Sequence, residues 1–254
     1  MIKPSQDLKK EFIKILEGID RSKHRQDNFR NMCEMAYCAL AKKTQPDEEK
    51  AEKLEARYME IVGSYRNKDD VREMPKLLSL VTLALSGGGC DFLGEIAGEI
   101  NALDTKNGQF FTPYDVSKFM AKLQIPNVSE IIKDKGYFTL SDPAAGAGCM
   151  ILAAADVVQE QGFHPMDCMS VHAVELNRMT YHMLYVQLAL RGIAAQIIHG
   201  NSLSLETFTG AYTPAAIYFL GKHGRLFDPA ERQDESRPPK TLTPIINGEQ
   251  LTLL

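Results

Sequence analysis

A short apolar run that ends on an acid and turns through small residues constrains the fold of this chain most. The run Tyr137–Leu140 is followed by Ser141–Gly148, with the sequence SDPAAGAG, and then by the alanine-rich stretch Cys149–Ala155. This order predicts a strand, a tight turn and a helix. Glycine and alanine let a ligand approach the turn closely, and the N–H groups that open a helix favour a carboxylate or phosphate. We therefore expect a nucleotide-like ligand at this turn.

Composition places the chain among ordinary globular proteins. Its 254 residues are 44% hydrophobic and 24% charged, and no apolar run reaches the length that a membrane helix needs. The first residues lack the core of a signal peptide, and the five cysteines are scattered, which favours reduced thiols. We expect a cytoplasmic protein with no membrane partner. The net charge of −4 argues against extensive DNA binding that ignores sequence.

The chain divides into two parts by pattern. Residues 1–103 are predicted to form a helical N-terminal domain, because apolar side chains recur there at helical spacing. Helices are expected near 5–19, 28–43, 47–65 and 75–85. Residues 104–254 are predicted to form an α/β domain in which strands and helices alternate, which is typical of a parallel sheet covered by helices. Within it, residues 225–254 are polar and proline-bearing and are expected to be an irregular tail.

Four strands are predicted in the second part, at 137–141, 170–174, 195–198 and 215–220. Polar side chains end the first three of them, namely Asp142, Glu175 and Asn201. In an open parallel sheet, ligands bind outside the carboxyl ends of the strands. Glu175 is suited to accept hydrogen bonds from a ribose diol, and the Asn201 amide to pair with an adenine edge. Alternatively, these residues are caps and turn formers. The turn contains G-x-G but lacks the third glycine of the dinucleotide-binding fingerprint G-x-G-x-x-G, which disfavours a nicotinamide or flavin enzyme.

Four elements of the sequence resemble a known family. Asp142–Gly148 resembles the S-adenosylmethionine motif of amino-methylating DNA methyltransferases. Gly108–Pro113 (GQFFTP) closely resembles an element of the adenine-N6 methylases that form the modification subunits of type I restriction systems. Ala173–Asn177 is similar to the family's ribose-binding strand end, and His199–Leu203 to its adenine-contacting element. The order and spacing of all four agree with that family, and the resemblance covers about residues 1–205.

The resemblance implies a Rossmann-like S-adenosylmethionine-dependent methyltransferase sheet preceded by a helical domain. It implies methyl transfer to adenine N6, with DNA and a specificity or other protein subunit as partners. Asp142 would bond the cofactor's amino group, Glu175 would hold the ribose hydroxyls, and Asn201 would lie at the adenine. The other cofactor-binding residues implied are those bordering the methionine portion (Phe111, Thr112, Pro113) and those of the close turn (Ala144, Gly146, Gly148).

The sequence departs from the family at the catalytic element. The family carries (N/D)-P-P-(F/Y) at the end of the fourth strand, and residues 1–254 contain no such tetrapeptide. If 215–220 is that strand, residues 221–224 occupy the position of the catalytic element. His223 is then the candidate to accept a hydrogen bond from the amine of the target base. A degenerate version ahead of the strand would instead use Thr213 and Pro214. Candidates to stack on a base that has been flipped out of the helix are Tyr212, Tyr218 and Phe219. The two prolines of Arg237–Lys240 are expected in an exposed loop.

Three functions follow from this gap. One is a divergent adenine methyltransferase that reads few bases or acts on single-stranded DNA, where flipping costs little. Another is a catalytically inactive, cofactor-binding subunit that acts with a partner, and the third is methylation of RNA or protein. No metal is expected, because His164, Cys168 and His172 lack the paired spacing of zinc ligands.

Overall fold

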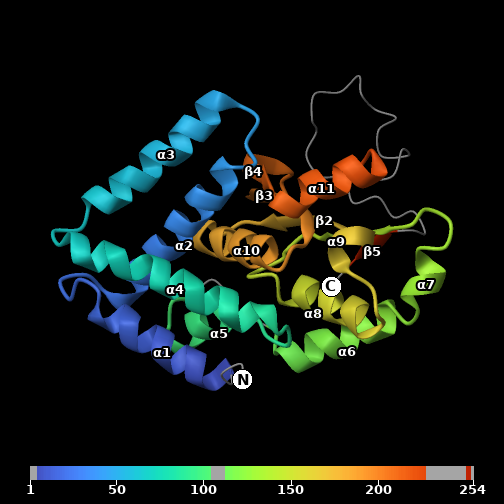
Figure 1. Ribbon diagram of the computed structural model, residues 1–254, viewed down its shortest axis with the longest axis horizontal. Coiled ribbons are helices and arrows are strands. Elements are labelled where there is room, and N and C mark those ends of the chain that lie inside the picture. Colours follow the sequence, from blue (N-terminus) through green and yellow to red (C-terminus); the bar gives the residue numbers. More distant parts are fainter. Residues whose placement is uncertain (1–4, 104–111, 227–249, 253–254) are drawn as a thin grey trace.

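The computed structural model of the chain describes residues 5–103, 112–226 and 250–252 (Figure 1). The first range is helical and lies at the left of Figure 1. Its later helices begin at side chains that accept a hydrogen bond from the first turn, Asp47, Asn67 and Asp91. The helices are α1 (Ser5–Gly18), α2 (Arg25–Lys42), α3 (Glu48–Gly63), α4 (Lys68–Ser86) and α5 (Phe92–Glu99).

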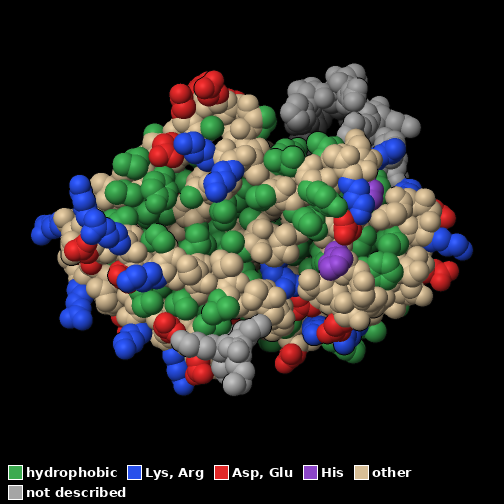
Figure 2. Space-filling view, in the orientation of Figure 1, with side chains coloured by type: hydrophobic (Ala, Val, Ile, Leu, Met, Phe, Trp, Pro, Cys, Tyr) green, Lys and Arg blue, Asp and Glu red, His purple; other side chains and the backbone are tan. Residues whose placement is uncertain are grey.

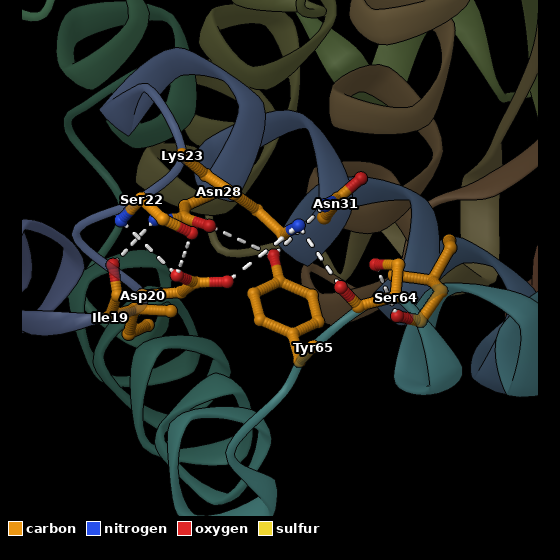
Figure 3. Close-up of polar contacts among 9 residues, drawn as sticks. Ile19, Asp20, Ser22, Lys23, Asn28, Asn31, Ser64 and Tyr65 are labelled. Carbon is orange, nitrogen blue, oxygen red and sulfur yellow. Dashed lines mark hydrogen bonds and ion pairs between the residues drawn. The ribbon is translucent and has the colours of Figure 1, made fainter.

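Aromatic packing and one polar corner hold these helices together. The Phe12 ring meets the rings of Phe29 and Phe92 edge-on, at centroid distances of 6.2 and 5.8 Å. At the corner, Asn28 Nδ2 donates to the Ile19 carbonyl at 2.7 Å, and its Oδ1 accepts from the Tyr65 hydroxyl at 3.0 Å (Figure 3). Buried polar groups of this kind need partners. The corner therefore joins the α1–α2 connection to the α3–α4 connection.

The sheet is built on parallel strands. Among the described residues it has five strands in the order β4-β3-β2-β1-β5. They are β1 (Phe138–Asp142), β2 (Met169–Glu175), β3 (Ala194–Asn201), β4 (Glu206–Tyr212) and β5 (Gln250–Thr252). Neighbouring strands are parallel except for β4, which is antiparallel to β3. Every residue of β1 is buried, as expected for a parallel strand covered on both faces. The predicted α/β class is confirmed.

Helix α10 packs between the sheet and the helical region. The remaining helices are α6 (Tyr114–Gln124), α7 (Val128–Ile131), α8 (Cys149–Glu160), α9 (Pro165–Cys168), α10 (Arg178–Leu190) and α11 (Pro214–His223). α8 packs against α6, and α10 against both α2 and β3. One hydrophobic core runs from Leu8 in α1 to Ala211 in β4. The helical region and the sheet therefore share a core, and a domain boundary at residue 103 stays a prediction.

The predicted fourth strand, residues 215–220, is wrong, because this segment lies in helix α11. Thr213 is its N-cap, and Pro214 occupies the first turn, where its missing N–H is not needed. Gly224 ends the helix in the left-handed conformation, and its N–H bonds the Leu220 carbonyl at 2.8 Å. The strand after β3 is β4, which the sequence analysis did not predict. Strand β5 lies within the segment that was expected to be an irregular tail.

All five cysteines are buried free thiols, which confirms the prediction of reduced cysteines. Cys149 is the first residue of α8, and burial raises the pKa of its thiol to about 12. Such thiols behave as small core side chains. Within the described ranges, no helix is both long enough and apolar enough to cross a membrane.

Candidate functional site

The carboxyl ends of β1, β2 and β3 form one edge of the sheet, here called the carboxyl edge. Asp142 is the last residue of β1 and lies opposite Ala173 of β2. Glu175 is the last residue of β2 and lies opposite His199 of β3. Because these strands are parallel, their terminal side chains meet at the same edge. The structure therefore brings Asp142 and Glu175 together as the sequence predicts, while their roles stay predictions.

The turn after β1 folds over the end of β2. The Asp142 carboxylate accepts a hydrogen bond from the Ala144 N–H at 3.1 Å. The Ala145 N–H bonds the Val174 carbonyl at 2.9 Å, and the Gly146 N–H donates to Glu175 Oε2 at 3.0 Å. The turn is thus held by the same acids that the sequence assigns to a ligand.

The two glycines of the turn are needed by the backbone. Gly146 and Gly148 have φ of +57° and +98°, a region that other residues avoid. A Cβ at Gly148 would also lie 2.8 Å from the Leu184 Cδ1 of α10. Helix α8 begins directly after Gly148, so its first N–H groups lie at the carboxyl edge. A helix N-terminus of this kind favours an anionic group.

Both acids of the carboxyl edge are buried, and no cationic side chain among the described residues pairs with them. Asp142 is 5% exposed and Glu175 9% exposed. Burial, helped by the neighbouring charge of Glu175, raises the pKa of Asp142 to about 7, although the Ala144 N–H opposes the shift. Burial also raises the pKa of Glu175, against the opposing hydrogen bonds from the backbone N–H groups of Asn177, Gly146 and Leu176. Within the described ranges neither acid forms an ion pair. The edge is therefore electrostatically suited to a cationic group.

Asn201 and the residues before α6 complete the predicted cofactor set. Asn201 Oδ1 accepts from the N–H groups of Leu203 at 2.9 Å and Ser204 at 3.2 Å, so this side chain acts as a turn former. Thr112 and Pro113 are exposed, and the Thr112 carbonyl accepts from Cys149 Sγ at 3.4 Å. That contact brings this segment to the start of α8. Phe111 lies outside the described residues.

The structure does not bring the three catalytic candidates to the carboxyl edge. Thr213 Oγ1 donates to the Ile193 carbonyl at 2.6 Å and accepts from the Ala195 N–H at 2.9 Å, where β3 begins. Pro214 follows it in α11. The His223 ring nitrogen Nε2 lies 2.8 Å from the Asp167 carbonyl oxygen, ahead of β2. All three therefore lie at the amino ends of the strands, here called the amino edge.

Helix α8 carries a buried ion pair that was not expected from the sequence. Asp156 of α8 accepts hydrogen bonds from Arg191, from the Tyr114 hydroxyl and from the Gly89 N–H. It thereby fixes Tyr114, the residue that follows Pro113. An acid inside the apolar run of α8 is the sequence signal that points to such a network. Among the described residues there is no cluster of three or more His, Cys, Asp or Glu that is suited to hold a metal ion.

The sheet defines an α/β protein whose candidate site lies at the carboxyl ends of its parallel strands. The model of the family described as "N-6 DNA Methylase" matches residues 95–219, a segment that contains Asp142, Glu175 and Asn201. This segment of the chain is therefore identified as a member of the N-6 DNA methylase family. No curated protein sequence matches the chain.

Solved structures give distant similarities. A protein described as a class I S-adenosylmethionine-dependent methyltransferase from Listeria monocytogenes is 15% identical, with a TM-score of 0.36 over 76% of this chain and 53% of that one. A type I restriction-modification methyltransferase subunit from Streptococcus thermophilus is 13% identical, with a TM-score of 0.39 over 79% of this chain and 59% of that one. An ATP-dependent type ISP restriction-modification enzyme bound to DNA is 15% identical, with a TM-score of 0.39 over 88% of this chain and 18% of that one. The chain spans less than two thirds of each of these proteins.

Proposed function

We propose that the carboxyl edge binds S-adenosylmethionine and that the chain transfers its methyl group to adenine N6 in DNA. One observation carries the proposal. Two buried carboxylates, Asp142 and Glu175, lie beside a left-handed glycine turn at the start of α8, inside the segment that matches the adenine methylase family. The family match supports the proposed reaction, and the geometry of the carboxyl edge supports the proposed cofactor.

The residues of the edge fit the parts of this cofactor. Asp142, buried with no cationic partner among the described residues, suits the positively charged amino group of the methionine portion. Glu175 Oε2 accepts from the Gly146 N–H and Oε1 from the Asn177 N–H, and a carboxylate oxygen can accept a further donor, here a ribose hydroxyl. The first N–H groups of α8 suit the methionine carboxylate. His199 of β3 lies opposite Glu175, and Asn201 is two residues further along β3. This position suits a contact with the adenine, which is joined to the ribose.

The chemistry needs little from the chain beyond position. When bound, S-adenosylmethionine would supply an electrophilic methyl group on its positively charged sulfur. The adenine N6 would bond to the methyl carbon as the carbon–sulfur bond breaks, with S-adenosylhomocysteine as the leaving group and water as the acceptor of the N6 proton. Asp142 would hold the methionine portion and Glu175 the ribose, so that the methyl donor between them is fixed relative to the incoming amine. Positioning alone lowers barriers of this kind substantially.

DNA is the proposed macromolecular partner, together with a specificity or other protein subunit. Lys and Arg side chains are frequent at the left of Figure 2, over the helical region, and Asp and Glu lie among them. A surface of mixed charge suits contacts with few phosphates rather than a long wrapped duplex. We propose that the chain reads few bases or acts on single-stranded DNA, where extruding a base costs little.

A second candidate function is cofactor binding without catalysis, in a subunit that needs a partner. The position of Thr213, Pro214 and His223 at the amino edge favours it, because no catalytic candidate lies beside Asp142.

Methyl transfer and cofactor binding together separate these functions. Wild type and Asp142→Ala are incubated with radiolabelled S-adenosylmethionine and with single-stranded or duplex DNA, and cofactor binding is measured by calorimetry. Labelled DNA that is lost in the variant supports the methyltransferase. Binding without transfer supports the non-catalytic subunit, and label in RNA or protein instead of DNA supports the third alternative. Absence of binding by the folded wild type contradicts all three, and a strong preference for a long duplex contradicts single-strand action.

A further inference from the structure

A buried glutamine joins the glycine turn to the helical region. Gln187 of α10 is 0% exposed, and all of its amide contacts are internal. Its Nε2 donates to the Ala147 carbonyl at 2.8 Å and to Asp91 Oδ1 at 2.7 Å. Its Oε1 accepts from the Leu93 N–H at 3.0 Å. One amide group therefore contacts both the turn and the start of α5.

The other end of this connection is equally fixed. Asp91 is the N-cap of α5, and its Oδ1 also accepts from the Gly94 N–H at 3.0 Å. The side chain is buried, and burial raises the pKa of Asp91 to about 6. Because Asp91 and Leu93 both belong to the first turn of α5, movement of that helix changes the hydrogen bonds available to Gln187.

Helix α10 also supports the turn at a second point. Ala147 lies between Gly146 and Gly148, and Leu184 fills the space that a Cβ of Gly148 would occupy. On the other side, Glu175 accepts from the Gly146 N–H at 3.0 Å. The turn is thus fixed from the ligand side by Glu175 and from the core side by Leu184 and Gln187.

We propose that Gln187 and Asp91 are positioning residues through which helix α5 sets the geometry of the glycine turn and hence its affinity for the cofactor. The identity of that cofactor rests on the proposed function. The coupling itself rests on the buried contacts of Gln187. Neither residue touches the ligand in this proposal, so each acts only through the peptide groups of the turn.

Four variants test the coupling. Gln187→Leu removes the amide at similar volume, and Asp91→Ala removes the acceptor on α5. Asp91→Asn keeps an oxygen that accepts from Gly94 and from Gln187, so it is the conservative variant. Asn28→Leu is the matched control, because it also removes a buried amide that bonds a backbone carbonyl, but in the polar corner of the helical region (Figure 3).

Two measurements are made on the full chain. Hydrogen–deuterium exchange follows the peptide covering residues 143–150 without cofactor, and calorimetry gives the dissociation constant for S-adenosylmethionine. We expect Gln187→Leu and Asp91→Ala to speed exchange of the turn and to weaken binding about tenfold, the effect of one good hydrogen bond. Asp91→Asn should stay within about twofold of wild type. Asn28→Leu should lower the melting temperature and leave both readouts unchanged.

The outcomes separate this inference from the proposed function. If the wild type binds no S-adenosylmethionine, the proposed function fails, while the exchange of residues 143–150 still decides the coupling. Equal effects of Gln187→Leu and Asn28→Leu on the turn, or no effect of Gln187→Leu and Asp91→Ala, overturn the inference. If Gln187→Leu does not fold, the contrast between Asp91→Ala and Asp91→Asn decides it.

Discussion

The acids at the two edges of the sheet differ in their partners and in the direction of their pKa shifts. At the amino edge, the Asp167 carboxylate accepts from Lys222 at 2.7 Å and from Tyr218 at 3.0 Å, and the Lys222 hydrogen bond lowers its pKa. At the carboxyl edge, Asp142 and Glu175 are buried with no cationic partner in the part of the chain that the structure describes, and the pKa of each is raised. The amino-edge acid is paired within the protein, whereas among residues 5–103, 112–226 and 250–252 no cationic side chain pairs with the acids of the carboxyl edge.

This difference indicates where a ligand contributes free energy. An acid that is paired within the protein stabilises the folded state at neutral pH. A buried acid without a cation destabilises it, and a ligand that supplies the missing cation recovers that loss as binding free energy. The comparison therefore favours a ligand at the carboxyl edge and a structural role for the amino edge.

The pH dependence of stability gives the largest expected contrast. The pKa of Asp142 is about 7 in the folded chain, above the ordinary value of 3.8. Between these values the folded chain holds a proton that the unfolded chain has released, so stability falls as pH rises through that window. Asp142→Asn removes this loss, and its advantage over wild type should grow from pH 4 to pH 8 to at most about 4 kcal/mol. Urea unfolding across this range measures it.

The amino-edge control should behave in the opposite sense. The lowered pKa of Asp167 means that its contribution to stability is present above its unfolded pKa and is lost as pH falls through the folded one. Asp167→Asn should therefore lose stability relative to wild type at neutral pH and approach it in acid. Parallel pH profiles for the two variants would contradict the distinction between the edges.

Cofactor affinity gives the next contrast. Asp142→Ala removes a hydrogen-bond acceptor for a charged amine, a contact of about 1.5–3 kcal/mol, so S-adenosylmethionine should bind about 10- to 100-fold more weakly. Asp167→Ala at the amino edge should change the dissociation constant less than about twofold. Calorimetry on both variants at pH 8 measures the difference. An effect of similar size at Asp167 would break the comparison.

Glycine substitutions compare the backbone of the two edges. Gly148→Ala meets both a φ of +98° and the Leu184 side chain, and should cost about 3 kcal/mol. Gly224 at the end of α11 has a φ of +70° and open space around its Cβ position, so Gly224→Ala should cost about 1 kcal/mol. Denaturant midpoints measure both, and equal costs would show that Leu184 moves aside.

The smallest effect is expected at His223. Its ring packs against Phe219 and Tyr137, at centroid distances of 4.4 and 4.9 Å. His223→Phe keeps this packing and should change methyl transfer less than about twofold, because the ring lies at the amino edge. Complete loss of transfer with unchanged cofactor affinity would instead identify His223 as the catalytic acceptor.

Much of the sheet could be predicted from sequence because it is buried. Strands β1, β2 and β3 are apolar runs of suitable length, and each predicted range falls within a residue or a few of the observed one. Asp142 and Glu175 were found because an acid directly after such a run stands out. Parallel pairing then brings them to one edge without further information.

The failures have equally physical causes. Residues 215–220 combine β-branched, aromatic and alanine residues, and a short apolar run does not distinguish a strand from a helix. The flanking Thr213-Pro214 and Gly224 were the better guides. Strand β4 was missed because nearly all of its residues are exposed and show no apolar face. Gln187 has no local pattern, since its three partners lie 40 to 96 residues away.

The buried cysteines can report local unfolding in several parts of the molecule. Only a thiolate that reaches solvent is alkylated quickly, so each thiol reacts only when the structure around it unfolds. Cys33 and Cys38 lie in α2, Cys90 precedes α5, Cys149 begins α8 and Cys168 ends α9. The labelling rate of Cys149, beside Gly148, measures how often the glycine turn unfolds. The labelling rate of Cys33 measures how often the helical region unfolds. Their ratio tells whether the two open as one unit or in succession.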